Sequence, residues 1–332
     1  MTAPRFLVLG SNSFSGATFT AFLAAAGHDV LAASRSPEPH EAFLPYRWSP
    51  DGARRVRFQT IDLNHDLDAL DALMRDERVS HVVNFAAQSM VGQSWIDPDH
   101  WMMTNVVSTI RLHDRLRRHD FLERYLHVTT PEVYGSTDGW VKEDAPFNPS
   151  TPYAVSRAAA DMSLRTYFTQ YGFPVVSTRA ANVYGPGQQL YRIIPRTILS
   201  AMAGRKLTLD GGGRSVRSFI EMTDVSDATL KIALSGRPGE TYHISTDRAV
   251  SIRELVEMIL ARLGKDFDAS VEVGPERPGK DTAYSLDSSK LRTELGWQDR
   301  ISLEQGIDDT IAWARRFEAA LMDMNWDYVH KA

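Results

Sequence analysis

Two short stretches of the chain carry a hydroxyl, a carboxylate, a phenol and a permanent cation. Thr130 and Glu132 follow an apolar run that predicts a strand. Tyr153 and Arg157 lie at the start of a predicted helix, where residues four apart share one face. The Arg157 guanidinium can then favour the phenolate of Tyr153, which can take a proton from an alcohol that loses hydride. For Tyr153 and Arg157 alone, a surface pair on an ordinary helix is an equally good explanation.

The elements that must position these residues follow from the hydrophobic pattern. The first half of the chain alternates short apolar runs with amphipathic segments, which predicts a parallel sheet covered by helices. The expected strands are Arg5–Leu9, Asp29–Ala33, Val56–Gln59, His81–Phe85, Tyr125–Thr129 and Val175–Thr178. The expected helices are Phe14–Ala26, Leu67–Arg75, Trp101–Arg118 and Tyr153–Tyr171. We therefore predict an α/β fold, a Rossmann-type doubly wound parallel sheet with a smaller C-terminal substrate-binding lobe.

The regular pattern loosens after Asn182, where the glycine-containing segments Val183–Gly187 and Gly211–Gly213 break it. We expect a dinucleotide-binding domain over residues 1–181, with a returning segment near 214–245, and a second lobe over 182–213 and 246–332. In the second lobe, Ser251–Leu263 has a Ser followed three residues later by a Glu, which predicts a helix that begins with a capping box.

The composition is that of an ordinary globular protein. The 332 residues include 43% hydrophobic and 24% charged residues, and the formal net charge is −5. This charge argues against nucleic acid as the main partner, so an anionic ligand must be met by local arginines. The chain has no cysteine, which excludes disulfides and thiolate ligands, and it has no apolar stretch of about 18 residues. We therefore expect a cytoplasmic protein that does not bind membranes.

No spacing of histidines and carboxylates along the chain is typical of a metal site. His81 and His127 fall within predicted strands and are expected to pack in the core. We therefore predict no metal.

A glycine-containing turn, Gly10–Gly16, connects the first predicted strand to the first predicted helix. In such a turn the backbone NH groups and the helix N-terminus can bind a pyrophosphate, provided that small residues let it come close. Gly10 and Gly16 suit that role, whereas Ser13 stands where a middle glycine is expected. A tight turn that only packs the helix on the strand is the alternative. The cofactor residues assigned from this turn are Gly10, Asn12, Ser13, Phe14 and Gly16.

The second predicted strand leads into Ser34, Arg35 and Ser36, with no acidic residue. An NAD enzyme normally has an Asp or Glu here to bind the adenosine ribose. Arg35 between two serines suits a 2′-phosphate, so NADP is slightly favoured over NAD. Arg35 could instead be solvated or stack on adenine.

Further cofactor residues are expected at the ends of the third and fourth strands. Asp62, with Leu63 beside it, is placed to hold the adenine amino group. Ala86 and Ala87 leave room for the ribose on the nicotinamide side, and Gln88 follows them.

Taken together, these residues resemble an extended short-chain dehydrogenase/reductase and, within that family, the nucleotide-sugar 4,6-dehydratases. The resemblance covers nearly the whole chain. Glu132 favours a dehydratase over a sugar epimerase, because epimerases of the family usually carry a small or apolar residue there. The landmarks are Gly10–Gly16, Asn84–Ser89, Thr104–Asn105, Thr130–Gly135, Tyr153 with Arg157, Asn182–Pro186, Arg217–Phe219 and Glu276–Asp281.

The resemblance implies the steps of a reaction in which Thr130, Glu132, Tyr153 and Arg157 are the catalytic residues. Tyr153 takes the proton of the hydroxyl on sugar carbon 4 while hydride passes to the nicotinamide, and Thr130 hydrogen-bonds the same oxygen. Glu132 then removes the proton on carbon 5, water leaves from carbon 6, and the hydride returns to carbon 6. The cofactor, NADP or NAD, is regenerated in each cycle and stays tightly bound.

The diphosphate of a nucleotide-sugar substrate needs positive charge and NH donors. The segments Trp101–His113 and Tyr153–Tyr171 resemble the long helices that pair two subunits in this family, so we expect a homodimer through a four-helix bundle. The residues assigned to the substrate are Ser89, Asn182, Arg192, Arg217 and Arg277.

Two residues depart from the family pattern. Pro131 stands where the dTDP-glucose enzymes have an Asp that protonates the leaving hydroxyl. Either Glu132 delivers this proton, or a water held by Thr130 does. Arg157 stands where the family almost always has Lys, so the cofactor placement can differ. These departures indicate a divergent branch whose sugar need not be glucose.

Two other functions remain open. A nucleotide-sugar epimerase or 4-dehydrogenase/reductase would use the same Tyr153 chemistry without eliminating water, and Pro131 favours it. A non-catalytic NADP-binding regulator would keep the fold without the chemistry. The joint presence of Thr130, Glu132 and Tyr153 favours an enzyme.

Overall fold

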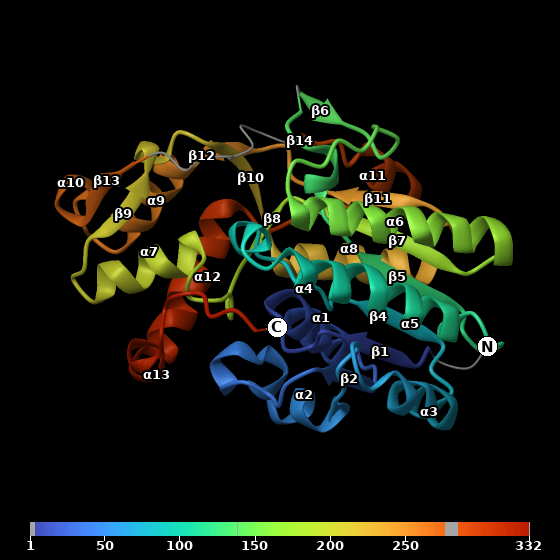
Figure 1. Cartoon of the computed structure of the whole chain (residues 1–332). Coiled ribbons are helices and arrows are strands. Elements are labelled where there is room, and N and C mark those ends of the chain that lie inside the picture. The colour runs from blue at the N-terminus through green and yellow to red at the C-terminus, as the bar shows by residue number, and fades with distance from the viewer. Residues whose placement is uncertain (1–3, 138, 276–284, 332) are drawn as a thin grey trace.

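A parallel sheet of seven strands forms the centre of the larger part of the molecule (Figure 1). The structure is a computed structural model, and it describes residues 4–137, 139–275 and 285–331. The strand order is β11-β7-β5-β4-β1-β2-β3. The strands are β1 (Phe6–Leu9), β2 (Val30–Ser34), β3 (Val56–Thr60), β4 (His81–Asn84), β5 (Arg124–Val128), β7 (Val175–Ala180) and β11 (Thr241–Ile244). The predicted Rossmann-type α/β fold is confirmed, with strand ends that differ from the expected ones by one or two residues.

Side chains alternate between the two faces of each strand, so the sheet has a core on both sides. In β1, Phe6 and Val8 belong to one core. Leu7 and Leu9 belong to the other. The helices that contribute to the first core are α1 (Phe14–Ala25), α8 (Met222–Ser235) and α11 (Ser289–Leu295). The helices that contribute to the second core are α3 (Leu67–Glu77), α5 (Thr109–Leu116) and α6 (Pro152–Tyr171).

The helix expected at Trp101–Arg118 begins earlier and changes its hydrogen-bond pattern within its length. Pro98 occupies its first position, where a missing backbone NH costs nothing. A π-helical segment follows, and such segments often occur at functional sites. Here it presents Asn105, which exchanges hydrogen bonds with the backbone of Gln88 in the loop after β4. The first two elements of this helical stretch are α4 (Pro98–Met102) and the π segment η4 (Met103–Ser108), and α5 follows them.

Smaller sheets and further helices, all after β7 in the chain except β6 (Trp140–Val141), make up most of the rest of the molecule (Figure 1). The small sheets comprise β12 (Ala249–Ser251), β10 (Val216–Glu221) and β8 (Asn182–Tyr184); β13 (Val271–Gly274) and β9 (Leu207–Asp210); and β14 (Ser285–Leu286) and β6. The helices of this region are α7 (Ile193–Met202), α9 (Ile252–Arg262), α10 (Phe267–Ser270), α12 (Leu303–Arg316) and α13 (Glu318–Asp323). The remaining short helices are α2 (Pro50–Arg55), η1 (Glu41–Phe43), η2 (Pro45–Arg47), η3 (Gly92–Trp95), η5 (Pro131–Tyr134) and η6 (Gly211–Gly213). Within the described ranges, every helix is too short or too polar to cross a bilayer.

The predicted capping box is confirmed at the start of α9. The Ser251 hydroxyl accepts a hydrogen bond from the backbone NH of Glu254 at 3.1 Å, and the Glu254 carboxylate accepts one from the backbone NH of Ser251 at 2.7 Å. Within the expected returning segment 214–245, β11 pairs with β7 in the large sheet. The lobe boundaries inferred from the sequence stay a prediction.

Glu221 is a buried carboxyl at the end of β10 that caps α8, where it accepts a hydrogen bond from the backbone NH of Thr223. It lies against Gly185, since a Cβ at Gly185 would come within 2.5 Å of the carboxylate. Burial raises the pKa of Glu221 from 4.5 to about 7. The folded protein therefore binds this proton more tightly than the unfolded chain does. Stability that is present at low pH is lost as the pH rises from about 4.5 to about 7.

We expect Glu221→Gln to remove this pH dependence. Relative to the native protein, the free energy of unfolding of the variant should rise by about 3 kcal/mol between pH 5 and pH 8, because about 1.4 kcal/mol corresponds to one pKa unit. Urea unfolding followed by tryptophan fluorescence at the two pH values measures the change. The exposed Glu257→Gln serves as the control and should show no such gain. If the free energy of unfolding of Glu221→Gln differed from that of the native protein by the same amount at pH 5 and at pH 8, the expectation would be wrong.

Candidate active site

The catalytic groups expected from the sequence meet at the carboxyl edge of the large sheet. Thr130 follows β5 and caps η5, its hydroxyl accepting a hydrogen bond from the backbone NH of Glu132 at 3.3 Å. Tyr153 lies in the first turn of α6, which Thr151 caps. The Tyr153 phenol hydrogen-bonds the Thr130 side chain and lies in electrostatic range of Glu132. The structure thus brings a hydroxyl, a carboxyl and a phenol together, and their catalytic roles stay a prediction.

The pKa of Tyr153 is raised, not lowered. Burial of the phenol is the largest cause of the rise, and the negative charge of Glu132 adds to it. The Arg157 charge, the Thr130 hydrogen bond and the Arg192 charge lower the pKa but do not outweigh burial. The expectation that Arg157 favours the phenolate is right in direction. Burial decides the net shift, and the sequence pattern does not reveal burial.

Arg157 is buried and turns toward the end of β5. Its guanidinium donates a hydrogen bond to the Val128 carbonyl and lies 3.4 Å from the His127 ring nitrogen. Burial, and then the Arg157 charge, lower the pKa of His127 well below its ordinary value, so this imidazole is neutral at pH 7. Arg157 is therefore fixed at the end of β5, close enough to Tyr153 for its charge to lower the pKa of the phenol.

A second buried cation, Arg179 of β7, lies in the same layer. It donates a hydrogen bond to the carboxylate of Asp161 at 2.8 Å and another to the Tyr134 hydroxyl. Asp161 lies one turn after Arg157 on α6 and also accepts a hydrogen bond from the Thr129 hydroxyl at 3.1 Å. Asp161 thus pairs with the buried Arg179, while Arg157 is the nearer cation that lowers the pKa of Tyr153. Sequence reasoning missed Asp161 and Arg179, which sit on different elements with no motif.

The turn after β1 has the geometry of a phosphate-binding loop. Gly10 has a φ of +77°, and a Cβ there would lie 2.6 Å from the backbone nitrogen of Ala86, so only glycine fits between the β1 and β4 loops. Ser13 caps α1, accepting a hydrogen bond from the Gly16 NH at 3.1 Å and donating one to the Gly10 carbonyl at 2.7 Å. Ser13 therefore closes the turn where a glycine was expected.

Two polar atoms of this turn suit a polar ligand. Within the described part of the chain, the Ser11 hydroxyl and the Asn12 side-chain oxygen are buried without a hydrogen-bond partner. The Asn12 side-chain nitrogen donates to the carbonyls of Ser36 at 2.8 Å and Pro37 at 3.0 Å. The phosphate-binding turn is thereby tied to the loop after β2. With the Gly10 cradle and the N-terminus of α1, these groups fit the pyrophosphate of a dinucleotide.

The other cofactor residues lie along the same edge. Ser34 ends β2, with Arg35 and Ser36 after it, and Asp62 and Leu63 follow β3. The Asp62 carboxylate accepts a hydrogen bond from the backbone NH of Asn64 at 2.8 Å, which shapes the turn. After β4, Ala86 donates its backbone NH to the Asn84 side chain at 2.9 Å, which holds Ala86 and Ala87 against the phosphate-binding turn.

The C-terminal segment contacts two of the expected cofactor residues. From α13 the chain returns to the middle of the molecule (Figure 1). The Lys331 carbonyl accepts hydrogen bonds from the Gln88 side chain at 2.7 Å and from the Arg35 guanidinium at 3.0 Å. Sequence reasoning missed this contact, because no local pattern relates residues so far apart in the chain.

The residues assigned to the substrate are only partly grouped. Arg192 immediately precedes α7 and is close enough to Tyr153 to lower its pKa. Asn182 pairs in register with Phe219 where β8 meets β10, and Arg217 lies earlier on β10. Ser89 is exposed in the loop after β4. Arg277, with the landmark Glu276–Asp281, lies outside the described residues.

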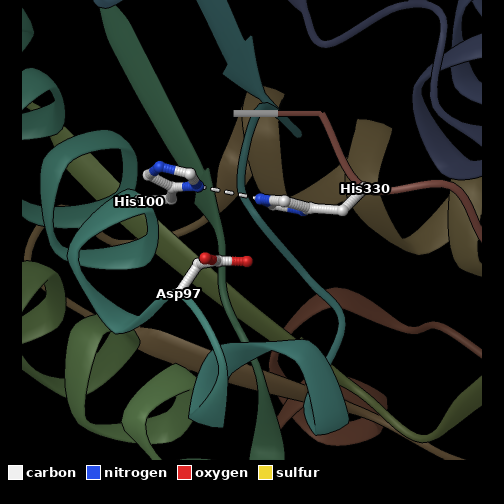
Figure 2. A group of neighbouring side chains, drawn as sticks. All are labelled: Asp97, His100 and His330. Atoms are coloured by element: carbon white, nitrogen blue, oxygen red, sulfur yellow. Dashed lines mark hydrogen bonds between the residues drawn. The ribbon is translucent and has the colours of Figure 1, made fainter.

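The structure also groups three side chains that can bind metals, which sequence reasoning missed. Asp97, His100 and His330 place one ligand atom each within 4.8 Å of one another. Figure 2 shows the side chains gathered between α4 and the C-terminal segment. The sequence showed no spacing typical of a metal site, because His330 joins the group only through the fold.

The sheet, the phosphate-binding turn and the helix that carries Tyr153 and Arg157 define an extended short-chain dehydrogenase/reductase. Within that class the chain belongs to the GDP-mannose 4,6 dehydratase family, whose model matches residues 7–310.

Individual relatives agree with this assignment. The chain is 36% identical over 260 residues to a dTDP-glucose 4,6-dehydratase of Xanthomonas campestris pv. campestris, covering 73% of this chain and 74% of the relative. It is 32% identical over 324 residues to a dTDP-glucose 4,6-dehydratase of Mycolicibacterium smegmatis, covering 95% and 94%. The crystal structure of DesIV, a dTDP-glucose 4,6-dehydratase from Streptomyces venezuelae with NAD bound, matches with a TM-score of 0.87 at 33% identity, covering 95% of this chain and 98% of DesIV.

Proposed function

We propose that this protein is a nucleotide-sugar 4,6-dehydratase, which converts a nucleoside-diphosphate hexose to its 4-keto-6-deoxy derivative. The observation that carries the proposal is the meeting of Thr130, Glu132 and Tyr153 at the carboxyl edge of the sheet, beside the phosphate-binding turn. A phenol and a hydroxyl that share one hydrogen bond can both bind the oxygen on sugar carbon 4. A carboxylate next to them can reach the neighbouring carbon. Membership of the dehydratase family supports the same reaction.

In the first step, Tyr153 accepts the proton of the carbon 4 hydroxyl, and Thr130 holds that oxygen in place. The charges of Arg157 and Arg192 favour the phenolate that Tyr153 must supply, against the rise in pKa caused by burial. When bound, the nicotinamide of NAD(P) accepts hydride from carbon 4 and later returns it to carbon 6.

In the second step, Glu132 removes the proton from carbon 5, which the ketone at carbon 4 has made acidic. The carbon 6 hydroxyl must gain a proton to leave as water, and Pro131 has no proton to give. Glu132, having just gained one, can deliver it, and solvent then supplies the proton that carbon 5 regains when hydride adds at carbon 6. A water held by Thr130 is the other donor. The hydroxide left behind would regain a proton from solvent, and Glu132 would keep its own proton and return it to carbon 5.

The test of this function is a mass measurement on a panel of nucleotide sugars. The purified protein should convert one of them to a product that is lighter by one water. A nucleotide-sugar epimerase or 4-dehydrogenase/reductase is the second candidate, and Pro131 is the observation that favours it. An epimerase product has the same mass as its substrate, and a 4-dehydrogenase product differs by hydrogen only, so the mass distinguishes all three reactions.

The cofactor is a dinucleotide of the NAD(P) class, and we propose NADP in preference to NAD. The loop after β2 carries Arg35 between two serines and no carboxylate, which suits a 2′-phosphate. The structural relative DesIV contains NAD, so this preference would be a point of divergence. Denaturing the protein and identifying the released dinucleotide by mass spectrometry decides between the two. Release of NAD alone would contradict the NADP preference without affecting the proposed reaction.

We further propose a homodimer through the helices that cover one face of the sheet. Three apolar side chains are exposed there: Met103 at 45% on η4, and Val155 at 42% and Met162 at 61% on α6. The η4 segment packs beside α6, and positions 155 and 162 are two helical turns apart on one face of α6. Exposed apolar side chains on two paired helices are typical of a helix-bundle interface.

We expect Met162→Asp to weaken this dimer, because the carboxylate would be buried without a partner. Light scattering after size-exclusion chromatography should show the native protein at twice the chain mass and the variant shifted toward the monomer. Leu234→Asp, which alters an exposed side chain of α8 on the opposite face of the sheet, should remain dimeric. A monomeric native protein would contradict the proposed interface.

A further inference from the structure

Three ligand-capable side chains from distant parts of the chain converge where α4 begins. Asp97 directly precedes α4 and His100 lies three residues later, so both can face the same side of the helix start. His330 comes from the C-terminal segment (Figure 2). All three side chains are half-buried, and their ligand atoms lie within 4.8 Å of one another.

The His330 ring is held by one ring contact and at both nitrogens. It stacks on the ring of buried Trp101, with centroids 5.1 Å apart and an interplanar angle of 13°. It lies end to end with the ring of His100, with centroids 5.2 Å apart and an interplanar angle of 14° (Figure 2). The Tyr328 hydroxyl lies 3.2 Å from His330 Nδ1. In most metal-binding histidines, the ring nitrogen that does not bind the metal makes a hydrogen bond that orients the ring. His330 Nε2 is thereby left to point at the His100 ring.

The two facing nitrogens are spaced almost as they would be around a metal ion. His100 Nδ1 and His330 Nε2 lie 2.9 Å apart, a distance at which one of them must donate a proton to the other. Around a tetrahedral zinc ion with Zn–N bonds of about 2.0–2.1 Å, two nitrogens are about 3.3 Å apart. A cation could therefore replace the shared proton if the nitrogens moved about 0.4 Å apart and the two rings tilted so that both lone pairs point at one centre. The Asp97 carboxylate supplies a third ligand and a negative charge.

We propose that Asp97, His100 and His330 bind one divalent transition-metal ion of the zinc class, with water in the fourth position, and that this ion fastens the C-terminal segment to α4. Two imidazoles and one carboxylate suit zinc in ligand type and number. The segment that the ion would hold continues to Lys331, whose carbonyl contacts Gln88 and Arg35. The metal would thus hold the C-terminal segment against the loops after β2 and β4.

The proposal is tested on the full chain without a histidine tag, treated with EDTA and dialysed. Titration with Zn²⁺ in a calorimeter should show one site per chain, and Co²⁺ should give the visible absorption of a tetrahedral nitrogen–oxygen site. His330→Ala and His100→Ala should each weaken Zn²⁺ binding at least about tenfold. Tyr328→Phe, which loses only the orienting hydrogen bond, should weaken it by about tenfold. His65→Ala, an exposed histidine outside the group, should bind as the native protein does.

A second measurement follows the C-terminal segment itself. Hydrogen exchange of the amides of residues 327–331 should slow in Zn²⁺ in the native protein and remain unchanged by Zn²⁺ in His330→Ala. Circular dichroism shows whether each variant is folded, and Asp97→Asn replaces any variant that is not. The absence of a saturable Zn²⁺ site, or equal Zn²⁺ affinity in the native protein and the folded variants, would overturn the proposal. Neither result depends on the proposed enzymatic function.

Discussion

The Glu132→Gln variant is expected to form the 4-keto-6-deoxy product about 10²–10⁴-fold more slowly than the native enzyme, the usual loss when a general base is removed. The amide has nearly the same shape as the carboxylate, so binding of the nucleotide sugar should change by less than about threefold. Oxidation at carbon 4 uses Tyr153 and Thr130, and it should survive the substitution. Product formation is measured by mass spectrometry and binding by calorimetry.

Accumulation of reduced cofactor distinguishes the loss of the base from a general loss of activity. With carbon 4 oxidised and water elimination blocked, Glu132→Gln should accumulate reduced cofactor, visible as its absorbance during a single turnover. Glu257→Gln, on the exposed surface of α9, serves as the control and should turn over normally. Unchanged water loss in Glu132→Gln would remove Glu132 as the base, and absence of reduced cofactor would indicate that the carboxylate also acts in the first step.

Asp161→Ala is expected to lower the free energy of unfolding by about 3–5 kcal/mol, the typical cost of leaving a buried ion without its partner. Arg179 is only 3% exposed and would lose the carboxylate that now lies 2.8 Å away. Thr129 would lose its acceptor at the same time. Urea unfolding at pH 7 measures the loss.

A carboxylate with similar partners but a different environment provides the control. Asp114 on α5 also pairs with two arginines, Arg117 and Arg118, but at the surface. Asp114→Ala should cost no more than about 1 kcal/mol, because solvent screens the exposed pair. If Asp161→Ala and Asp114→Ala lowered the free energy of unfolding by the same amount, burial would not be what makes the Asp161–Arg179 ion pair important for stability.

The local elements of the fold could be predicted because their signals lie within a few residues. The apolar runs that became β1 and β4 are short, are bounded by turn residues, and are buried on both faces in a parallel sheet. Gly10 follows the first run at once, and its place between two loops requires a residue without a side chain. The capping box of Ser251 and Glu254 is likewise a contact between neighbours in sequence.

The helix at Trp101–Arg118 shows where local signals end. Its apolar pattern predicted a helix, and a helical stretch is found there. The π segment, in which Asn105 hydrogen-bonds the backbone of Gln88, depends on the loop after β4. The same holds for Tyr153. Its spacing to Arg157 was visible in the sequence, whereas the burial that raises its pKa depends on how α6 packs over the sheet.

The sequence by itself determined the class of fold and the succession of strands and helices along the first half of the chain, because each depends on periodicity or spacing over one or two turns. It also supplied the candidate catalytic side chains, through short motifs that resemble those of a known family. Only the tertiary structure decided that Asp161 balances Arg179, and that His330 and Lys331 return to α4 and to the loops after β2 and β4. These contacts join segments far apart in the chain. Such contacts depend on how whole helices and strands pack together, and local backbone preferences do not reveal that packing.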